Sequence, residues 1–364
     1  MLFATCGTAH AASVVDSPVA TTSGWIAIAN LDQQITELGG EASVVELLLA
    51  RARFLGDYEA LDRASAITEG RAETRDELLR RARTRSAVHR FADALADLAA
   101  AERLGAGLED TDGLRSSIQV ATGRAAEVIP QLEAGLIRQP GLASRCALAG
   151  AYAAVGRLGE AEGLYVAALA GLDTTSPFPY AWVHFARGLM WAEQGRDAAR
   201  GEALYAKALA YLPQFEGAAI HLAELEVARG AVASAIARLE RVVASGDEPE
   251  ALALLGQLHV RTGDAARGWR EISRARERYE RLLARHPLAF ADHAAEFYLG
   301  MGADAERAWV LAERNLANRE TARALALAIK AAEAAGRHRE ACALAARARA
   351  ESQPVPGVAC RGPS

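Results

Sequence analysis

The sequence has few cysteines. Its 364 residues contain four, Cys6, Cys146, Cys342 and Cys360, and no two of them form a C-x-x-C pair. Zinc ribbons and thioredoxin-like redox sites need that spacing, so both are excluded. Cys146 lies on an apolar helix face, and we expect it in a core. Cys342 and Cys360 flank the tail "ESQPVPGVAC"; in an oxidising compartment they could form a disulfide that holds the tail to the last helix, and the alternative is two free thiols.

An excess of positive charge is also missing. The formal net charge is −5, and the richest basic stretch, Arg75 to Arg90, is accompanied by Glu73, Asp76 and Glu77. Such a mixture is typical of a solvated helix face, so we expect no nucleic-acid partner. No apolar run after residue 20 approaches the roughly 18 residues of a membrane span, so we expect no transmembrane helix either.

The N-terminus lacks part of an export signal. "MLFATCGTAHAAS" is apolar and small, and Ala9, His10 and Ala11 form an A-x-A cleavage site, but a charged region and a full apolar region are absent. We interpret residues 1–24 as a signal-peptide remnant followed by a flexible lead-in, which predicts a periplasmic or extracytoplasmic protein of bacterial origin. The alternatives are a lipoprotein anchored at Cys6 and a cytoplasmic protein with an unstructured N-terminus.

Alternation of β-branched residues is almost absent, and glycines recur instead at regular intervals. Successive members of the series are 33 to 39 residues apart, and one histidine stands in for a glycine: Gly56, His89, Gly123, Gly156, Gly195, Gly230, Gly263, Gly302 and Gly336. A period near 34 residues predicts an array of helix-turn-helix repeats. A glycine at each turn suits the left-handed backbone that ends a helix.

Small residues mark the helix contacts within each repeat. If the turn glycine is numbered 15, position 8 carries a small residue in all but the last of eight repeats, where Ile329 stands: Ala82, Ser116, Ala149, Gly188, Ala223, Gly256 and Ala295. Position 20 is also small in several repeats, as at Ala161 and Gly268. Two helices joined by a short turn pack closely only where no bulky side chain intervenes, so we expect position 8 to meet position 20.

This pattern resembles the tetratricopeptide repeat family. The family signature is a small residue at position 8, an aromatic at 11, Gly at 15, Ala at 20, an aromatic at 24 and Ala at 27. The segment from Leu142 to Leu169 has these residues in order: Ala149, Tyr152, Gly156, Ala161, Tyr165 and Ala168. The resemblance implies an all-α fold, a right-handed α-solenoid of antiparallel helix pairs.

We divide the chain into four parts on this basis. Residues 25–41 form an amphipathic capping helix, with Trp25 as an anchor and Ile26, Ile28, Leu31, Ile35 and Leu38 on its apolar face. Residues 42–351 form about nine repeats, and residues 352–364 form a Pro-rich tail. The turns at Gly195 and Gly302 need about one inserted residue before position 20. One long interval contains an extended loop after residue 170, and the other contains a lengthened second helix before Pro287.

Catalytic motifs are missing from the sequence. It contains no G-x-S-x-G, no H-E-x-x-H and no phosphate-binding loop. Asp292, His293 and Glu296 lie close together on one helix, with His286 upstream, and such residues can bind zinc. We favour the alternative that they are a polar groove face or a buried histidine, and we expect no metal, no cofactor and no enzymatic activity.

The resemblance places partner contacts at positions 2, 5, 9, 12 and 13 of the first helices, which line the concave face. Carried over residue by residue, these are Trp182, Phe185, Leu189, Glu193, Ile220, Glu224, Val227, Gln257, Arg261, Asp292, Glu296, Arg323 and Lys330. The groove is then apolar in the middle and acidic toward Glu224 and Glu296. It would accept an extended or helical peptide with apolar anchors and some positive charge. The alternative for Trp182 and Phe185 is a place in the core between repeats.

We therefore predict a non-enzymatic scaffold that binds another protein or a peptide in its concave groove, with a monomer favoured. Two alternatives remain open. One is a periplasmic accessory or assembly factor for a membrane or secretion complex, which requires that the N-terminus is an export signal. The other is a structural module that self-associates through its terminal repeats.

Overall fold

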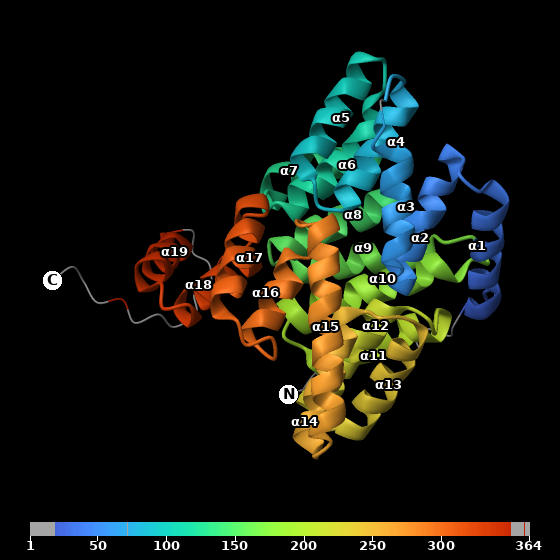
Figure 1. Cartoon of the computed structure of the whole chain (residues 1–364). Helices are drawn as coiled ribbons and strands as arrows, with labels where there is room; N and C mark the ends of the chain where they lie inside the picture. Colours follow the sequence, from blue (N-terminus) through green and yellow to red (C-terminus); the bar gives the residue numbers. More distant parts are fainter. Residues whose placement is uncertain (1–18, 71, 351–359, 361–364) are drawn as a thin grey trace, which may run out of the picture.

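The computed structural model describes residues 19–70, 72–350 and 360. All regular secondary structure in these residues is helical (Figure 1). None of the helices in this part of the chain is both long and apolar enough to span a membrane. Residues 1–18, which hold most of the proposed signal-peptide remnant, lie outside the described residues, as does the tail apart from Cys360.

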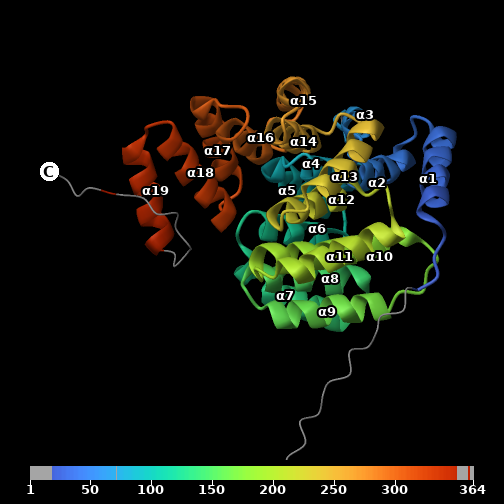
Figure 2. The same cartoon turned by 90° about the horizontal axis from the view of Figure 1, so that it is seen from below.

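The chain is an all-α solenoid, which confirms the predicted fold class. Helix α1 (Gly24–Leu38) and the short 3-10 helix η1 (Ala42–Val44) come first, and nine helix pairs follow in the described residues. Figure 2 shows the last pairs stacked one after another at one end. The pairs are α2 (Val45–Leu55) with α3 (Tyr58–Thr68), α4 (Arg75–Ala87) with α5 (Phe91–Arg103), α6 (Leu108–Ala121) with α7 (Ala125–Arg138), α8 (Leu142–Ala154) with α9 (Leu158–Ala170), α10 (Pro177–Leu189) with α11 (Ala198–Tyr211), α12 (Glu216–Ala228) with α13 (Val232–Ser245), α14 (Pro249–Thr262) with α15 (Ala265–Arg285), α16 (Ala291–Leu299) with α17 (Ala305–Asn318), and α18 (Ala322–Ala334) with α19 (His338–Ala350).

The turns inside the pairs use a left-handed residue. Most of the turn glycines have positive φ, and His89 takes the same conformation with φ +58°. At two turns the left-handed residue is not the aligned glycine but the next residue, Arg196 (φ +52°) or Ala303 (φ +49°). An extra residue in the preceding helix causes the shift at Gly195, because α10 continues into the π-helix η2 (Met190–Gln194), a form that accommodates one insertion.

Two glycines allow a close contact between helices α14 and α15. A Cβ atom on Gly268, at position 20, would lie 2.5 Å from the carbonyl oxygen of Gly256, at position 8. A Cβ atom on Gly256 would lie 2.8 Å from the carbonyl oxygen of Gly268. Helices α14 and α15 therefore meet backbone to backbone, as the small residues at these two positions predicted.

Helix α1 covers the first repeat with only part of its predicted apolar face. Leu31 and Ile35 are buried with Val44, Val45 and Leu48. The expected anchor, Trp25, is instead 68% exposed, and Ile26 is exposed as well. The backbone at the start of α1 instead packs closely against Pro213, because a Cβ on Gly24 would lie 2.8 Å from Pro213 Cδ. Trp25 therefore points away from the helix contact that we expected it to make.

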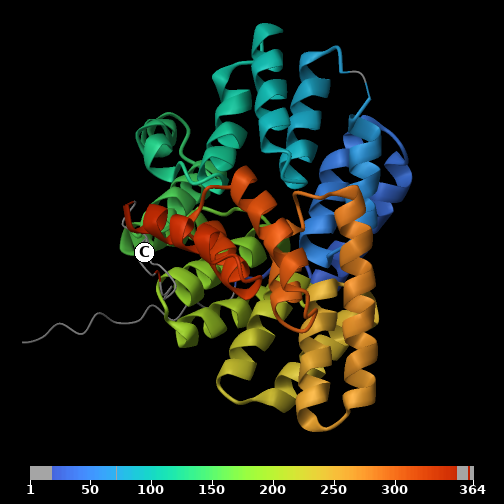
Figure 3. The same ribbon diagram turned by 60° about the vertical axis from the view of Figure 1, so that its left-hand side comes forward.

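The solenoid closes on itself, so that its first repeats contact its last ones (Figures 1 and 3). The rings of Tyr58 and Phe290 pack edge to face with centroids 4.9 Å apart. The long helix α15 reaches the first repeat, where His286 Nε2 lies 2.7 Å from Asp62 Oδ1 and Arg285 also pairs with Asp62. The lengthened second helix in the sequence therefore serves this closure.

The second and third repeats close against the connection between α17 and α18. Asn318 Nδ2 donates a hydrogen bond to the carbonyl oxygen of His89 at 3.0 Å. Arg319 Nε donates to the carbonyl oxygen of Ala121 at 3.3 Å. Both contacts join residues about 200 positions apart in the chain, so sequence-distant repeats become neighbours.

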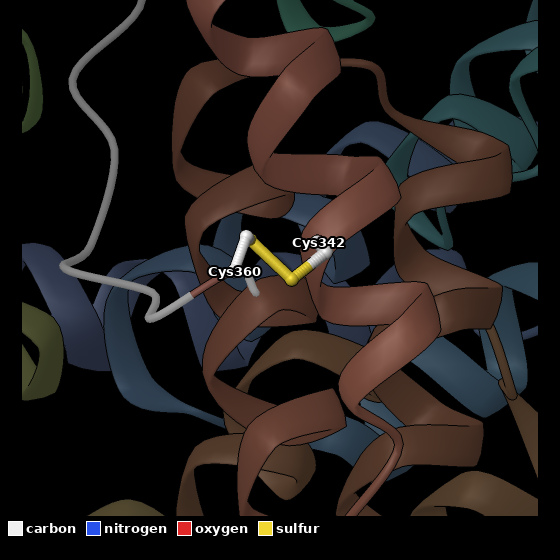
Figure 4. The surroundings of a disulfide bond; sticks show 2 residues. All are labelled: Cys342 and Cys360. Atoms are coloured by element: carbon white, nitrogen blue, oxygen red, sulfur yellow. A yellow bond between two sulfur atoms is a disulfide. The ribbon is translucent and has the colours of Figure 1, made fainter. Parts of the chain in front are cut away.

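A disulfide joins Cys342 on α19 to Cys360, with the two Cα atoms 5.6 Å apart (Figure 4). It is one of the two states that the sequence left open for this pair. Cys146 is a free thiol on α8, half-buried against the apolar residues of the fourth repeat.

Candidate partner-binding site

Charged side chains from the first helices of the fifth to ninth repeats converge in the interior of the solenoid. Arg323 on α18 has its Nη2 3.3 Å from both carboxylate oxygens of Glu296 on α16. Its Nη1 also lies 3.7 Å from Glu193 Oε2 in η2. One arginine therefore joins the ninth repeat to the eighth and to the fifth, and the curvature of the solenoid brings these helices to a common space.

Two histidines extend this group across α12, α14 and α16. His221 Nδ1 lies 2.9 Å from Glu224 Oε2 on the same helix. His293 Nδ1 on α16 lies 3.4 Å from Glu250 Oε2 on α14. Together with the three residues above, these four form what we call the charged cluster: Glu193, His221, Glu224, Glu250, His293, Glu296 and Arg323.

The glutamates raise the pKa of both histidines and so favour their charged form. Glu250 raises the pKa of His293 well above its usual value, although burial opposes this, and Asp292 adds to the effect. Burial acts to lower the pKa of His221, but the hydrogen bond and charge of Glu224 outweigh it and raise the pKa. Burial likewise acts to raise the pKa of Glu250, and His293 reverses this. The pair of Glu250 and His293 is therefore an ion pair at neutral pH.

The cluster is acidic and open to solvent. Four glutamates face one arginine and two histidines, and the side chains of Glu224 and Arg323 keep 46% and 49% of their surface exposed. A cavity of about 220 Å³ opens beside Glu250 and His293, with Tyr58 and His89 from the first two repeats on its other side. A ligand in this interior would meet carboxylates that it can reach, so positive charge is favoured.

The residues predicted to contact a partner lie in different surroundings in the structure. Glu193, Glu224, Glu296 and Arg323 lie in the charged cluster. Leu189 and Val227 are half-buried against the cores of neighbouring repeats. Gln257 is half-buried, and Arg261 and Lys330 are exposed. None of the hydrogen bonds and ion pairs among the described residues joins these three to the cluster.

Four of the predicted residues belong to the interior packing instead. Phe185 is buried with its ring 4.7 Å from that of Phe215, and Trp182 is half-buried between the same aromatic core and the fourth repeat. Ile220 is buried among the helices of the sixth and seventh repeats. Asp292 is buried and pairs with Arg319 at 3.2 Å. Phe185 therefore has the place in the core between repeats that the sequence left open as its alternative, and closure and inter-repeat packing cover Ile220 and Asp292 as well.

Two cluster residues, Glu250 and His221, were missed from the sequence although it carries a signal for each, whereas His293 was named there as part of a polar groove face or as a buried histidine. Glu250 occupies position 2 of the seventh repeat, the same position as Arg323 in the ninth. His221 and His293 both occupy position 6, and each is followed three residues later by a glutamate. The metal-like group around His293 is an ion-pair network, and no set of three metal-ligating side chains suited to an ion occurs in the described residues.

Comparison with known proteins agrees with this architecture. Residues 192–258, from η2 to α14, match the family model described as tetratricopeptide repeat. No curated protein has a sequence that matches the chain significantly.

Solved structures of similar fold share little sequence with this chain. The Cut9–Hcn1 hetero-tetramer of the APC/C has 15% identity and a TM-score of 0.48 over 89% of this chain and 64% of that one. The human IFIT1 dimer with PPP-AAAA has 16% identity and a TM-score of 0.45 over 90% and 91%. A tetratricopeptide repeat protein from Parabacteroides merdae has 16% identity and a TM-score of 0.42 over 71% and 98%. This chain thus spans 64% of the length of the matched Cut9–Hcn1 chain. Residues 192–258 therefore match the tetratricopeptide repeat family, and the helix pairs of the described residues repeat the same arrangement, as the sequence pattern indicated.

Proposed function

We propose that this chain is a non-enzymatic scaffold that binds a basic segment of another protein in its interior. The charged cluster is the observation that supports this, because glutamates from four consecutive repeats meet in one accessible space. The only arginine of the cluster, Arg323, is shared between two of them. A segment with two or more lysines or arginines would relieve the repulsion that remains among these carboxylates.

The interaction depends on salt. The glutamates are partly exposed, and exposed ion pairs contribute about 0.2–1 kcal/mol each and are screened by salt. Several such pairs are needed for a stable complex. Their summed electric field raises the association rate more than it lengthens the lifetime of the complex. We expect partner binding to weaken markedly as ionic strength rises.

The test is capture of the native partner with the full chain, followed by fluorescence anisotropy on labelled partner segments. The double variant Glu224→Lys and Glu296→Lys should weaken binding at least about tenfold, which corresponds to about 1.4 kcal/mol for two reversed charges. Glu313→Lys is the matched control, because Glu313 is exposed on the outer helix α17. Circular dichroism establishes that the variants fold. Equal binding by the double variant and the control would contradict the proposal, and so would preferential binding of acidic segments.

We further propose that the protein works outside the cytoplasm. The disulfide between Cys342 and Cys360 supports this, because such bonds persist in oxidising compartments and are rare in the cytosol. An accessory factor for a membrane or secretion complex would also need to be located outside the cytoplasm.

Thiol labelling in the native host tests the compartment. Cells are quenched in acid and denatured, and the protein is alkylated with and without reductant and examined by mass spectrometry. We expect Cys146 to be labelled in both samples, and Cys342 and Cys360 only after reduction. Labelling of all three without reductant would place the protein in a reducing compartment. Sequencing of the mature N-terminus supplies an independent answer, because export predicts a start near Ala12.

A further inference from the structure

A second, larger cavity lies between the first repeat and the sixth and seventh repeats. Its volume is about 620 Å³, which is within the range of small-molecule sites, about 300–1,000 Å³. Residues of α1, α2 and α3 form one wall, and residues of α11, α12, α13, α15 and the loop before α14 form the other. Tyr58 and Glu248 line both this cavity and the smaller one beside the charged cluster, and the hydroxyl of Tyr58 donates to Glu248 Oε1 at 3.1 Å. No residue of the charged cluster lines the larger cavity, so the larger cavity is a distinct site.

Two buried carboxyl groups line the larger cavity. Glu216 and Glu248 are each 7% exposed. Their hydrogen bonds come from neutral donors: Ser245 Oγ to Glu216 Oε1 at 3.2 Å, and the backbone N–H of Ala251 to Glu248 Oε2 at 2.7 Å. Buried carboxylates ordinarily have a cationic partner, and none of the ion pairs among the described residues includes either of these two.

Three of the four arginines that line the cavity are already engaged elsewhere, and the fourth, Arg241, is exposed. Arg51 pairs with Asp57 at 2.6 Å, Arg238 with Glu226 at 2.7 Å, and Arg278 with Asp247 at 3.1 Å. Each of these guanidinium groups is neutralised by its own carboxylate. The buried groups of the wall that lack a cationic partner are therefore Glu216 and Glu248, which carry negative charge only when they are ionised.

The cavity has features that suit an organic ligand. Trp25 is largely exposed at its edge, and Leu55, Leu209 and Val242 add apolar surface. The side-chain amide of Gln214, which also lines the cavity, has buried nitrogen and oxygen atoms without a hydrogen-bond partner among the described residues. Buried amides are nearly always hydrogen-bonded, so this one indicates a group that a ligand would supply.

We propose that this cavity binds a small organic ammonium cation with an apolar body, whose charge lies against Glu216 and Glu248. The apolar body lies along the aliphatic wall toward Trp25. Because the cavity is formed by the first repeat and by the sixth and seventh, the ligand also joins the two ends of the closure. This site is independent of the proposed peptide interaction at the charged cluster.

Binding is linked to proton release. Burial raises the pKa of Glu216 to about 8, and the negative charges of Glu248 and Asp57 contribute. Burial and Glu250 also raise the pKa of Glu248. From the first repeat, the charged or titratable groups that face this pair are Arg51, Asp57, Tyr58 and Glu59. From the later repeats they are Arg238, Arg241, Asp247, Glu250, Arg278 and His293. A bound cation favours the ionised carboxylates, so it displaces a proton at neutral pH and binds more tightly as pH rises toward 8.

The experiment is isothermal titration calorimetry of the full chain with 2-phenylethylamine. The controls are 2-phenylethanol, which lacks the charge, and 3-phenylpropionate, which reverses it. We expect the amine to bind at least about tenfold more tightly than either control. We also expect its measured enthalpy to differ between phosphate and Tris buffers because protons are released. A Kd weaker than about 10 mM for the amine, equal binding of the alcohol, or tighter binding of the propionate would overturn the proposal.

Variants locate the site. Glu216→Gln has the shape of the protonated acid, so it should fold, weaken amine binding about tenfold and reduce the buffer dependence, which Glu248 alone then supplies. Gly246→Phe should block the cavity without backbone strain, because Gly246 is extended (φ −166°) and a Cβ there meets only Glu216 Oε1 at 3.8 Å. Glu224→Gln, in the charged cluster, should bind the amine like the wild type. Unchanged amine binding by both Glu216→Gln and Gly246→Phe would refute the assignment, whatever the outcome for the peptide partner.

Discussion

Closure of the solenoid can be tested with two alanine substitutions that differ in one contact. Gly123 and Gly156 both occupy turn position 15, with φ of +91° and +81°. Alanine at either site should lower the free energy of unfolding by a similar amount, about 1–2 kcal/mol, because of the left-handed backbone. A Cβ at Gly156 meets nothing within 4 Å, but a Cβ at Gly123 would lie 2.2 Å from the carbonyl oxygen of Glu320. The difference in free energy of unfolding between the two variants therefore measures the contribution of the contact across the closure.

The size of the difference follows from what must move. No Cβ can remain 2.2 Å from a backbone oxygen, so Glu320 and its neighbours must shift away from the third repeat. The bonds from Arg319 to Ala121 and from Asn318 to His89 lie on the same connection. An intramolecular hydrogen bond contributes about 0.5–1.5 kcal/mol, so their loss adds about 1–3 kcal/mol to the cost of Gly123→Ala.

Hydrogen exchange is the appropriate assay, because long repeat arrays do not always unfold in one step. Gly123→Ala should lower the protection of amides in residues 315–325 and in the third repeat, whereas Gly156→Ala should affect only the fourth repeat. Urea unfolding followed by circular dichroism gives the global free energies of unfolding for the same pair. If both variants lose the same stability within about 0.5 kcal/mol, and residues 315–325 keep their protection, the closure contact is absent in solution.

Two further predictions concern helix contact and pH. Gly268→Ala should lower the free energy of unfolding by about 1–2 kcal/mol, because overpacking outweighs the gain in helix propensity. Gly163→Ala, on an open face of α9, should raise the free energy of unfolding by up to about 1 kcal/mol. Urea titration measures both changes, and changes of equal sign would contradict the packing argument. Burial, and secondarily Arg319, lowers the pKa of His89 to about 4. The unfolded chain therefore binds the proton first, and stability present above pH 6.5 is lost as pH falls toward 4, by about 3 kcal/mol. His89→Gly keeps the left-handed turn, so its unfolding free energy should fall less over this range; an unchanged slope would show that His89 is not the group responsible.

The architecture could be predicted from the sequence because it depends on local periodicity. The recurrence of glycine about every 34 residues and the small residues at position 8 identify helix pairs without reference to distant parts of the chain. The turns at Gly195 and Gly302 show the limit of this approach. Each glycine fits its alignment, yet it allows close approach to Trp191 or Phe297, and the next residue adopts the left-handed conformation.

The site could be predicted only in part, because it depends on curvature. Repeat position identified Glu224 and Glu296, which are on the concave face of their own helices. It failed for Asp292, because Arg319 and the first repeats cover that face of α16. The meeting of Arg323 with Glu193 could not be foreseen, since small rotations between successive repeats accumulate over four repeats before the two residues meet.

The closure and the acidic interior affect each other's stability. The charged cluster is assembled only when the ninth repeat lies against the fifth, because Arg323 joins them. The remaining glutamates repel one another in that arrangement and therefore oppose it. A basic segment bound there removes the repulsion. A ligand that binds only the closed form stabilises that form more strongly as the ligand concentration rises above Kd. By linkage, substitutions that open the closure must also weaken binding of the partner. Gly123→Ala, which is remote from every residue of the charged cluster in the sequence, should therefore reduce partner affinity more than Gly156→Ala does. Equal affinities, with the closure shown to be open in one variant, would mean that the partner binds outside the interior.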